Sequence, residues 1–195
     1  MREPHPLAVI HDAVLEFLRG RDDAVLYGAQ AVNAYIDEPR MTQDVDIASP
    51  RAAELAEELR RFLNQRFRIA VRAREIREGL GYRICQVRRP KNRHLVDPRP
   101  VNELPPAQRV RKVLVVIPPE LIANKVMSMV GRQKKRKGTM DRADLMTLFV
   151  TFPELKTMDG EVAKRLRAAG ATPEVMTAWK ELVEQEILPD EDEGY

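Results

Sequence analysis

The sequence changes its pattern at Pro118 and Pro119, and this change limits the fold more than any other feature. Before the two prolines, short apolar runs with strand-like alternation are mixed with helix-like segments. After them, helical patterns follow one another and are separated by glycine and proline. We therefore predict an α+β domain over residues 1–118 and a helical domain over residues 119–195 that completes a cleft. The helical patterns of the second domain cover residues 119–133, 141–152, 159–170 and 173–187.

The first domain is predicted to contain several short strands and three helices. Apolar spacing predicts a helix at 7–19, and a buried strand at 24–28 leads into a short helix at 29–36. Ser49 is the expected N-cap of a strongly amphipathic helix at 50–66. Further strands are predicted at residues 41–48, 67–73, 81–89, 93–100 and 111–117.

The composition is that of a globular chain rather than a disordered or membrane-spanning one. Of the 195 residues, 44% are hydrophobic and 32% are charged. The longest apolar run, Val113 to Ile117, is far too short to cross a bilayer, and the N-terminus has no apolar core of signal-peptide length. The single cysteine, Cys85, excludes an intrachain disulfide and a cysteine metal cluster. We therefore expect a cytoplasmic protein with no membrane segment.

Two aspartates two positions apart are the main candidates for a chemical site. Alternation along residues 41–48 places Asp44 and Asp46 on one face of a strand, with Val45 and Ile47 on the other. Two carboxylates this close raise each other's pKa unless a cation lies between them. Mg²⁺ prefers such hard oxygen ligands, and two ions can clamp both reacting oxygens of a nucleotidyl transfer. A solvated strand face with alternating acids would produce the same pattern.

Gly28 closes an apolar strand and precedes a short helix. Because glycine has no side chain, backbone N–H groups at this turn can approach a phosphate, and the N-terminus of the helix adds a favourable partial charge. The order of strand, glycine, helix and aspartate-bearing strand therefore predicts a phosphate-binding turn beside a metal site.

This combination resembles the DNA polymerase β-like nucleotidyltransferase superfamily, whose pattern is an apolar strand, Gly-Gly or Gly-Ser, a helix, and then D-x-D or D-x-E. Within it, the sequence is similar to the AbiEii-like family, known from abortive-infection and toxin–antitoxin systems. Residues 40–46 match the family's R-x-T-x-D-[hydrophobic]-D block in full, and residues 28–31 match its G-G-x-A opening except at Ala29. Residues 115–148 match a later pattern of PE-x-L, Lys, Arg and D-x-x-D-L, so the resemblance covers roughly residues 24–150.

The resemblance implies a mixed sheet with flanking helices, and a site that binds Mg²⁺ or Mn²⁺ together with an NTP. Two metal ligands come from the D-x-D pair, and a third carboxylate is expected from a later strand. Asp97 is the candidate for it, with Glu75 and Glu78 as alternatives. The implied catalytic residues are Asp44, Asp46, Asp97 and Lys125, of which the three aspartates are the metal ligands. The implied nucleotide-binding residues are Gly28, Ala29, Arg40, Thr42, Lys125 and Arg132.

Several of these residues have plainer explanations. Lys125 could form a salt bridge with Asp144 that only docks helices, instead of reaching a triphosphate. Asp141 could be no more than an N-cap of the helix that follows it. Arg40 and Thr42 could only brace the strand.

The predicted function is the metal-dependent transfer of a nucleoside monophosphate from an NTP to an acceptor. The basic run at 132–137 favours RNA, tRNA in particular, as the acceptor, and a protein acceptor is the other option. A solvated face or loop is the plainer explanation of such a run. The resemblance also implies an antitoxin partner. Because Ala29 offers a phosphate its backbone N–H but no hydroxyl, an alternative is a weak or inactive module of the same fold that binds nucleotide, RNA or a protein. A structural protein with solvated acids is a third interpretation.

Overall fold

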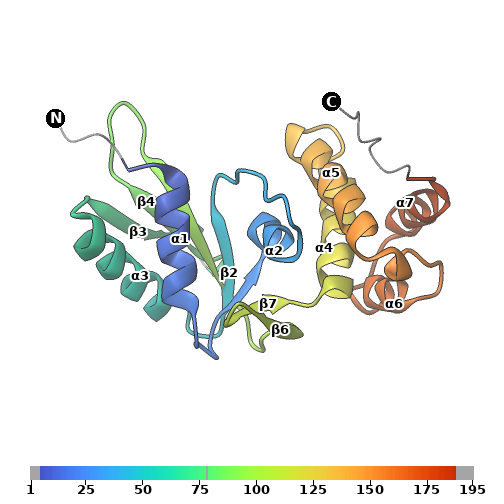
Figure 1. Ribbon diagram of the computed structural model, residues 1–195, viewed down its shortest axis with the longest axis horizontal. Helices are drawn as coiled ribbons and strands as arrows, with labels where there is room; N and C mark the ends of the chain where they lie inside the picture. The colour runs from blue at the N-terminus through green and yellow to red at the C-terminus, as the bar shows by residue number, and fades with distance from the viewer. Residues whose placement is uncertain (1–4, 78, 188–195) are drawn as a thin grey trace. The chain divides into compact units, whose positions relative to one another are not determined.

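The computed structural model describes residues 5–77 and 79–187 and forms two compact units, Met1–Val116 and Ile117–Tyr195 (Figure 1). The first unit holds a sheet with its helices, and the second unit is helical. Glu78 and the acidic C-terminal end lie outside the described residues. Among the residues described, no helix combines the length and the apolar character that a membrane crossing requires.

The first unit is built on one seven-stranded sheet. Its strands are β1 (Val25–Tyr27), β2 (Val45–Ser49), β3 (Val71–Glu75), β4 (Tyr82–Gln86), β5 (Arg93–Pro100), β6 (Ala107–Val110) and β7 (Val113–Val116). The strands lie in the order β3-β4-β5-β2-β1-β7-β6. Parallel pairs join β1 to β7 and β2 to β5, and the other neighbours are antiparallel. The predicted α+β class with a mixed sheet is therefore confirmed.

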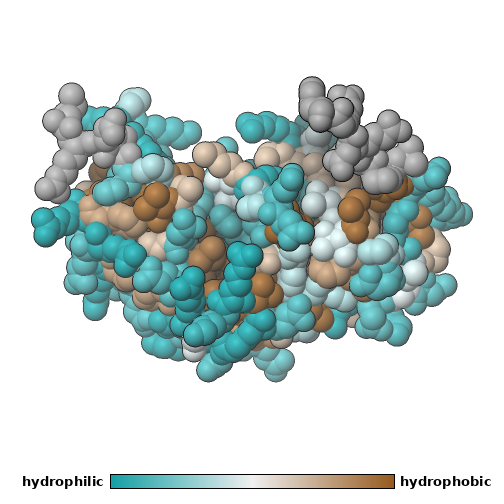
Figure 2. Space-filling view, in the orientation of Figure 1, coloured by the Kyte–Doolittle hydropathy of each residue, from teal (hydrophilic) through white to brown (hydrophobic). Residues whose placement is uncertain are grey.

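One face of this sheet is covered by helices. The helices of the first unit are α1 (Leu7–Leu18), α2 (Gly28–Tyr35) and α3 (Ala52–Phe67). In α3, the side chains of Leu55, Leu59 and Leu63 recur every four residues and are fully buried. The helix packs on β3, β4 and β5 and beside α1, and hydrophilic side chains predominate on its outer surface (Figure 2). The apolar stripe of α3 thus fixes which face of the sheet is buried.

The strand that carries the aspartates starts later than predicted. β2 begins at Val45, so Asp44 lies just before the strand. Ser49 is the last residue of β2, where it pairs with Pro100, and it is not the N-cap of α3. Its hydroxyl accepts the backbone N–H of Arg51 at 3.0 Å. The parallel pairing with β5 therefore extends β2 one residue beyond its predicted end, and α3 begins two residues later than predicted, at Ala52.

One further strand was not predicted, and another begins later than predicted. β6 had no counterpart among the predicted strands, and it pairs with β7 through a turn at Arg111 and Lys112, whose φ angles are 47° and 71°. Such turns usually carry Asn-Gly or Gly-Gly because both residues need positive φ, so two basic residues give no turn signal. The strand predicted at 67–73 begins only at Val71, because α3 continues to Phe67.

The second unit contains the four predicted helices. They are α4 (Pro118–Gly131), α5 (Arg136–Thr151), α6 (Glu161–Ala168) and α7 (Pro173–Glu184), with a short 3-10 turn at Pro153–Leu155. α5 starts earlier than predicted, so Asp141 lies inside the helix and is not an N-cap. Phe149 and Trp179 are buried with their ring centroids 6.0 Å apart, and this aromatic pair lies in the core of the unit.

Replacing Leu59 with alanine should lower the free energy of unfolding by about 2–5 kcal/mol, because the shorter side chain leaves a cavity between α3 and the sheet. Urea unfolding followed by circular dichroism measures the change. The control is Arg61→Ala, where the side chain is 65% exposed, and the free energy should change by less than about 0.5 kcal/mol. Equal losses in the two variants would show that Leu59 does not carry the packing of α3.

Candidate active site

The pairing of strands places two of the predicted acids side by side. β2 and β5 are parallel neighbours, and their register sets Asp46 opposite Asp97. On the other side of β2, the antiparallel register with β1 sets Tyr27 opposite Asp46. Residues directly opposite each other on neighbouring strands project from the same face of a sheet. Asp97, the predicted third carboxylate, is therefore brought next to Asp46.

Asp44 joins this group through a histidine. Its Oδ2 lies 3.1 Å from Nδ1 of His94, and Nε2 of His94 lies 2.6 Å from Oδ1 of Asp97. One donor atom from each of the three residues lies within 4.8 Å of the others, which is close enough for all three to hold one metal ion. The three predicted aspartates are thus gathered around β2 and β5, although Asp44 precedes its strand.

The buried carboxylate of Asp97 is held by two side chains, Arg83 and His94. Arg83 donates to it twice, from Nε to Oδ1 at 3.1 Å and from Nη2 to Oδ2 at 3.0 Å, and the Asp97 side chain is only 7% exposed. Burial by itself would raise the pKa of Asp97, but the hydrogen bonds from His94 and Arg83 outweigh it, and the pKa lies below its usual value. Asp97 is therefore ionised at neutral pH.

His94 was not among the residues that the sequence singled out. On a regular strand, residues three apart point to opposite faces, so His94 and Asp97 would be separated by the sheet. The pairing between β4 and β5 shifts at this point, since Ile84 lies opposite Val96 and Cys85 lies opposite His94. This irregularity adds one residue to β5 and turns His94 to the face of Asp97, as bulges beside active sites do. The alternation of residues along the sequence does not predict this orientation of His94.

Gly28 is required by the position of Asp46. Its φ is +70°, and a Cβ atom at this position would lie 2.3 Å from Oδ2 of Asp46. The carboxylate therefore lies directly against the glycine backbone at the start of α2. No side chain caps this helix, whose first N–H groups belong to Gly28 and Ala29. The predicted phosphate-binding turn and the predicted metal ligands are thus in contact.

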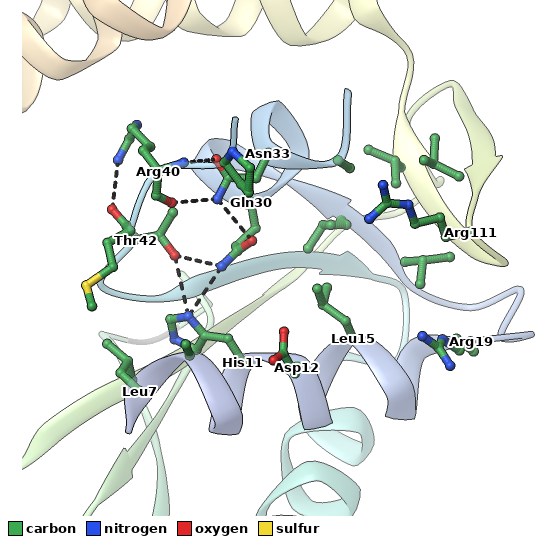
Figure 3. Close-up of a pocket in the computed structure, with 18 residues that line it drawn as sticks. Leu7, His11, Asp12, Leu15, Arg19, Gln30, Asn33, Arg40, Thr42 and Arg111 are labelled. Atoms are coloured by element: carbon green, nitrogen blue, oxygen red, sulfur yellow. Dashed lines mark hydrogen bonds between the residues drawn. The ribbon is translucent and has the colours of Figure 1, made fainter. Parts of the chain in front are cut away.

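Arg40 and Thr42 line a pocket of about 440 Å³ beside α1 and α2 (Figure 3). The side-chain amide of Asn33 holds the backbone of Arg40, donating to its carbonyl at 2.8 Å and accepting its N–H at 3.1 Å. Gln30 donates to the hydroxyl of Thr42 at 2.8 Å, and His11 Nδ1 lies 3.5 Å from that hydroxyl. These contacts tie the segment that leads into Asp44 to α1 and α2, and a contact of Arg40 or Thr42 with a nucleotide stays a prediction.

Lys125 is buried in the second unit between two acids. Its Nζ donates to Asp141 Oδ1 at 2.9 Å and to Asp144 Oδ2 at 2.6 Å, and its side chain is 8% exposed. Arg132 Nη1 lies 3.6 Å from Asp141 Oδ2. The salt bridge between Lys125 and Asp144 joins α4 to α5. A contact of Lys125 or Arg132 with a nucleotide stays a prediction.

Glu75, one of the two alternatives to Asp97 as the third carboxylate, is not part of the cluster formed by Asp44, His94 and Asp97. Glu75 is exposed at the end of β3, where it pairs with Tyr82, and its Oε1 accepts the backbone N–H of Gly79 at 3.1 Å. It therefore belongs to the hairpin between β3 and β4. Glu78 lies outside the described residues.

Solved structures share this fold at low sequence identity. JHP933 from Helicobacter pylori matches with a TM-score of 0.59 and 13% identity over 90% of this chain and 87% of that chain. ANT(2")-Ia in complex with adenylyl-2"-tobramycin matches with a TM-score of 0.50 and 13% identity over 90% and 97%. The Megavirus polyadenylate synthase matches with a TM-score of 0.58 and 14% identity over 75% of this chain, which spans only 32% of that synthase. At such identities the likeness establishes the nucleotidyltransferase fold.

Sequence comparisons give the family. No curated protein sequence matches the chain. A family model described as "Nucleotidyl transferase AbiEii toxin, Type IV TA system" matches residues 13–194. This match covers nearly the whole chain and includes the glycine turn, the three aspartates and the lysine of the second unit. The chain belongs to the AbiEii family of nucleotidyltransferase toxins.

Proposed function

We propose that this protein transfers a nucleoside monophosphate from an NTP to an acceptor hydroxyl. The observation that carries the proposal is the contact between the Gly28 turn and Asp46, which is itself beside Asp97 and close to Asp44. In this reaction the acceptor oxygen bonds to the α-phosphorus, the bond from that phosphorus to the bridging oxygen breaks, and pyrophosphate leaves. The hydroxyl proton passes to solvent or to a carboxylate of the site. The family and the fold are both those of nucleotidyltransferases.

The donor atoms at this site fit a hard divalent cation. Asp44, Asp46 and Asp97 supply carboxylate oxygens, which suit Mg²⁺ or Mn²⁺, and the lowered pKa of Asp97 keeps that group in the ligating form. When bound, such an ion offsets charge on the phosphate oxygens and promotes formation of the nucleophile. Because Arg83 and His94 already hold both oxygens of Asp97, Asp97 is better placed to bind and orient than to accept a proton.

The protein's own groups would bind the triphosphate. The free N–H groups at the start of α2 point out of the helix and favour an anion there. Gly28 permits that close approach because its missing Cβ leaves room for both Asp46 and a ligand. Ala29 contributes a backbone N–H in the same turn.

RNA, tRNA in particular, is the acceptor class that we favour over a protein. The basic run at 132–137 connects α4 to α5 and supplies the first two residues of α5, and it is mostly exposed. Exposed basic residues bind the phosphates of nucleic acids. Since the family is described as a type IV toxin–antitoxin system, we also propose that a cognate antitoxin neutralises this protein.

A catalytically weak module of the same fold is the second candidate. Two observations favour it: Ala29 has no hydroxyl for a phosphate, and both oxygens of Asp97 are already engaged. Such a protein would bind nucleotide, RNA or a partner without turnover.

Incubation with each labelled NTP, Mg²⁺ or Mn²⁺, and total RNA or lysate should give transfer of the label. Asp46→Asn should reduce the transfer by at least about a hundredfold, because it removes a charged metal ligand. Asp37→Asn is the control, because Asp37 is exposed and lies outside the site. If no NTP and neither metal gives transfer while RNA is still retained, the binding module is the correct function.

Gly28→Ala should abolish transfer, because the new Cβ atom would displace the Asp46 carboxylate. The matched control is Gly20→Ala. Gly20 also has a positive φ, +76°, but no atom lies within 4 Å of its Cβ position. Both variants should carry the backbone strain of about 1–2 kcal/mol, measured as a drop in thermal stability, and only Gly28→Ala should lose activity. An equal loss of activity in both variants would show that contact between a Cβ atom at residue 28 and Asp46 does not explain the loss.

Lys125→Met should lower the free energy of unfolding by about 3–5 kcal/mol, because it removes the buried cation that contacts both Asp141 and Asp144. The double variant with Asp144→Leu removes one of these carboxylates and should recover part of the stability. We expect the KM for NTP to rise at least about tenfold in the double variant if Lys125 contacts the triphosphate. An unchanged KM would restrict Lys125 to joining α4 and α5.

A further inference from the structure

A line of charged residues crosses the sheet next to the aspartates. In the hairpin of β3 and β4, Arg74 lies opposite Arg83. Arg83 reaches Asp97 on β5, and Asp97 lies opposite Asp46 on β2. Because opposite residues share a face, these arginines and the carboxylates of the site lie on the same face of four neighbouring strands. At about 4.8 Å per strand, Arg74 is roughly 14 Å from Asp46.

This face is the one that α3 leaves open. Val71, Ile84 and Val96 are buried, and they alternate along their strands with the arginines. Since α3 packs on these same three strands, the apolar side chains face the helix and the arginines face away from it. Arg72, which lies opposite Cys85, and Arg74 are exposed on the open face.

The arginines carry charge that the described part of the chain does not neutralise. Within residues 5–77 and 79–187, no carboxylate lies within ion-pair distance of Arg72, Arg74 or Arg99. The guanidinium of Arg99 lies 5.8 Å from the ring centroid of Tyr27, beside the Gly28 turn. If the arginines lay only on the edge strand β3, protection of that strand from pairing with other chains would explain them. Here the arginines continue inward to β4 and β5, beyond the edge strand β3.

We propose that Arg72, Arg74 and Arg99 form a basic face that binds the phosphate backbone of a nucleic-acid strand, whose terminal hydroxyl then lies at Asp46 and Asp97. Guanidinium groups suit this role because they donate two parallel hydrogen bonds to a phosphate. The position of the basic face in the first unit distinguishes it from the basic run between α4 and α5. The assignment of the strand as acceptor rests on the proposed transfer, but binding itself does not.

The binding of a fluorescent single-stranded RNA, measured by anisotropy without NTP between 50 and 200 mM salt, tests the basic face. Arg72→Ala with Arg74→Ala should weaken binding by roughly tenfold and make the slope of log K against log salt less steep by about 1.4, which is about 0.7 for each phosphate that the variant no longer binds. The control is Arg61→Ala with Arg66→Ala, which removes the same charge from the opposite side, on α3. Equal weakening by both pairs would overturn the proposal.

Cys85 provides a second measurement, since it is the single cysteine of the chain and lies opposite Arg72. RNA bound on the basic face should slow the alkylation of Cys85 by iodoacetamide at least severalfold, as followed by intact mass. An unchanged rate at RNA concentrations that saturate the anisotropy would place the RNA elsewhere and overturn the proposal.

The inactive variant Asp46→Asn separates this proposal from the proposed function. It should still bind RNA and protect Cys85, because the arginines are intact. If wild-type protein transfers no label but shows both effects, the basic face stands and the transferase function fails. If label is transferred to RNA and neither effect depends on Arg72 and Arg74, the transferase function stands and the basic face is wrong.

Discussion

The parallel pairing of β2 with β5 is the constraint on which the site depends. It sets Asp46 beside Asp97 in a sheet whose other face is packed against α3. Two carboxylates on adjacent strands repel each other, and the protein offsets this with Arg83 and His94, which hold Asp97 from two sides. The same arginine extends the row of charges toward β3. One register therefore determines the acid cluster, its counter-charges and the arginines next to it.

The glycine turn depends on that register as well. β1 ends beside Asp46, so the first residue of α2 meets the carboxylate directly, and only a residue without Cβ fits. Asp46, Asp97 and the start of α2 are consequently held together by the pairing of β1, β2 and β5. This part of the site is preorganised, because backbone pairing and not side-chain rotamers alone fixes the positions of Asp46 and Asp97.

The sequence was sufficient to predict the parts of the fold and site that depend on local pattern. Alternation and helical spacing predicted a first unit that mixes strands and helices and the four helices of the second unit. The family resemblance implied the mixed sheet, and the D-x-D pair with Gly28 indicated the candidate site. Long-range pairing was not available from the sequence, so the start of β2 and the strand β6 were missed. Asp97 could be named only as one of three candidates, because the register that brings it to Asp46 joins residues about fifty positions apart. His94 could not be found, because its orientation comes from an irregularity in pairing.

That irregularity makes the site depend on chain length as well as on residue identity. If β4 had one more residue between Ile84 and Cys85, the two strands would pair regularly, and the imidazole of His94 would turn to the opposite face while the aspartates kept their places. An insertion in β4 at this point is therefore a change by which a related protein could lose the candidate nitrogen ligand without altering any of its carboxylates.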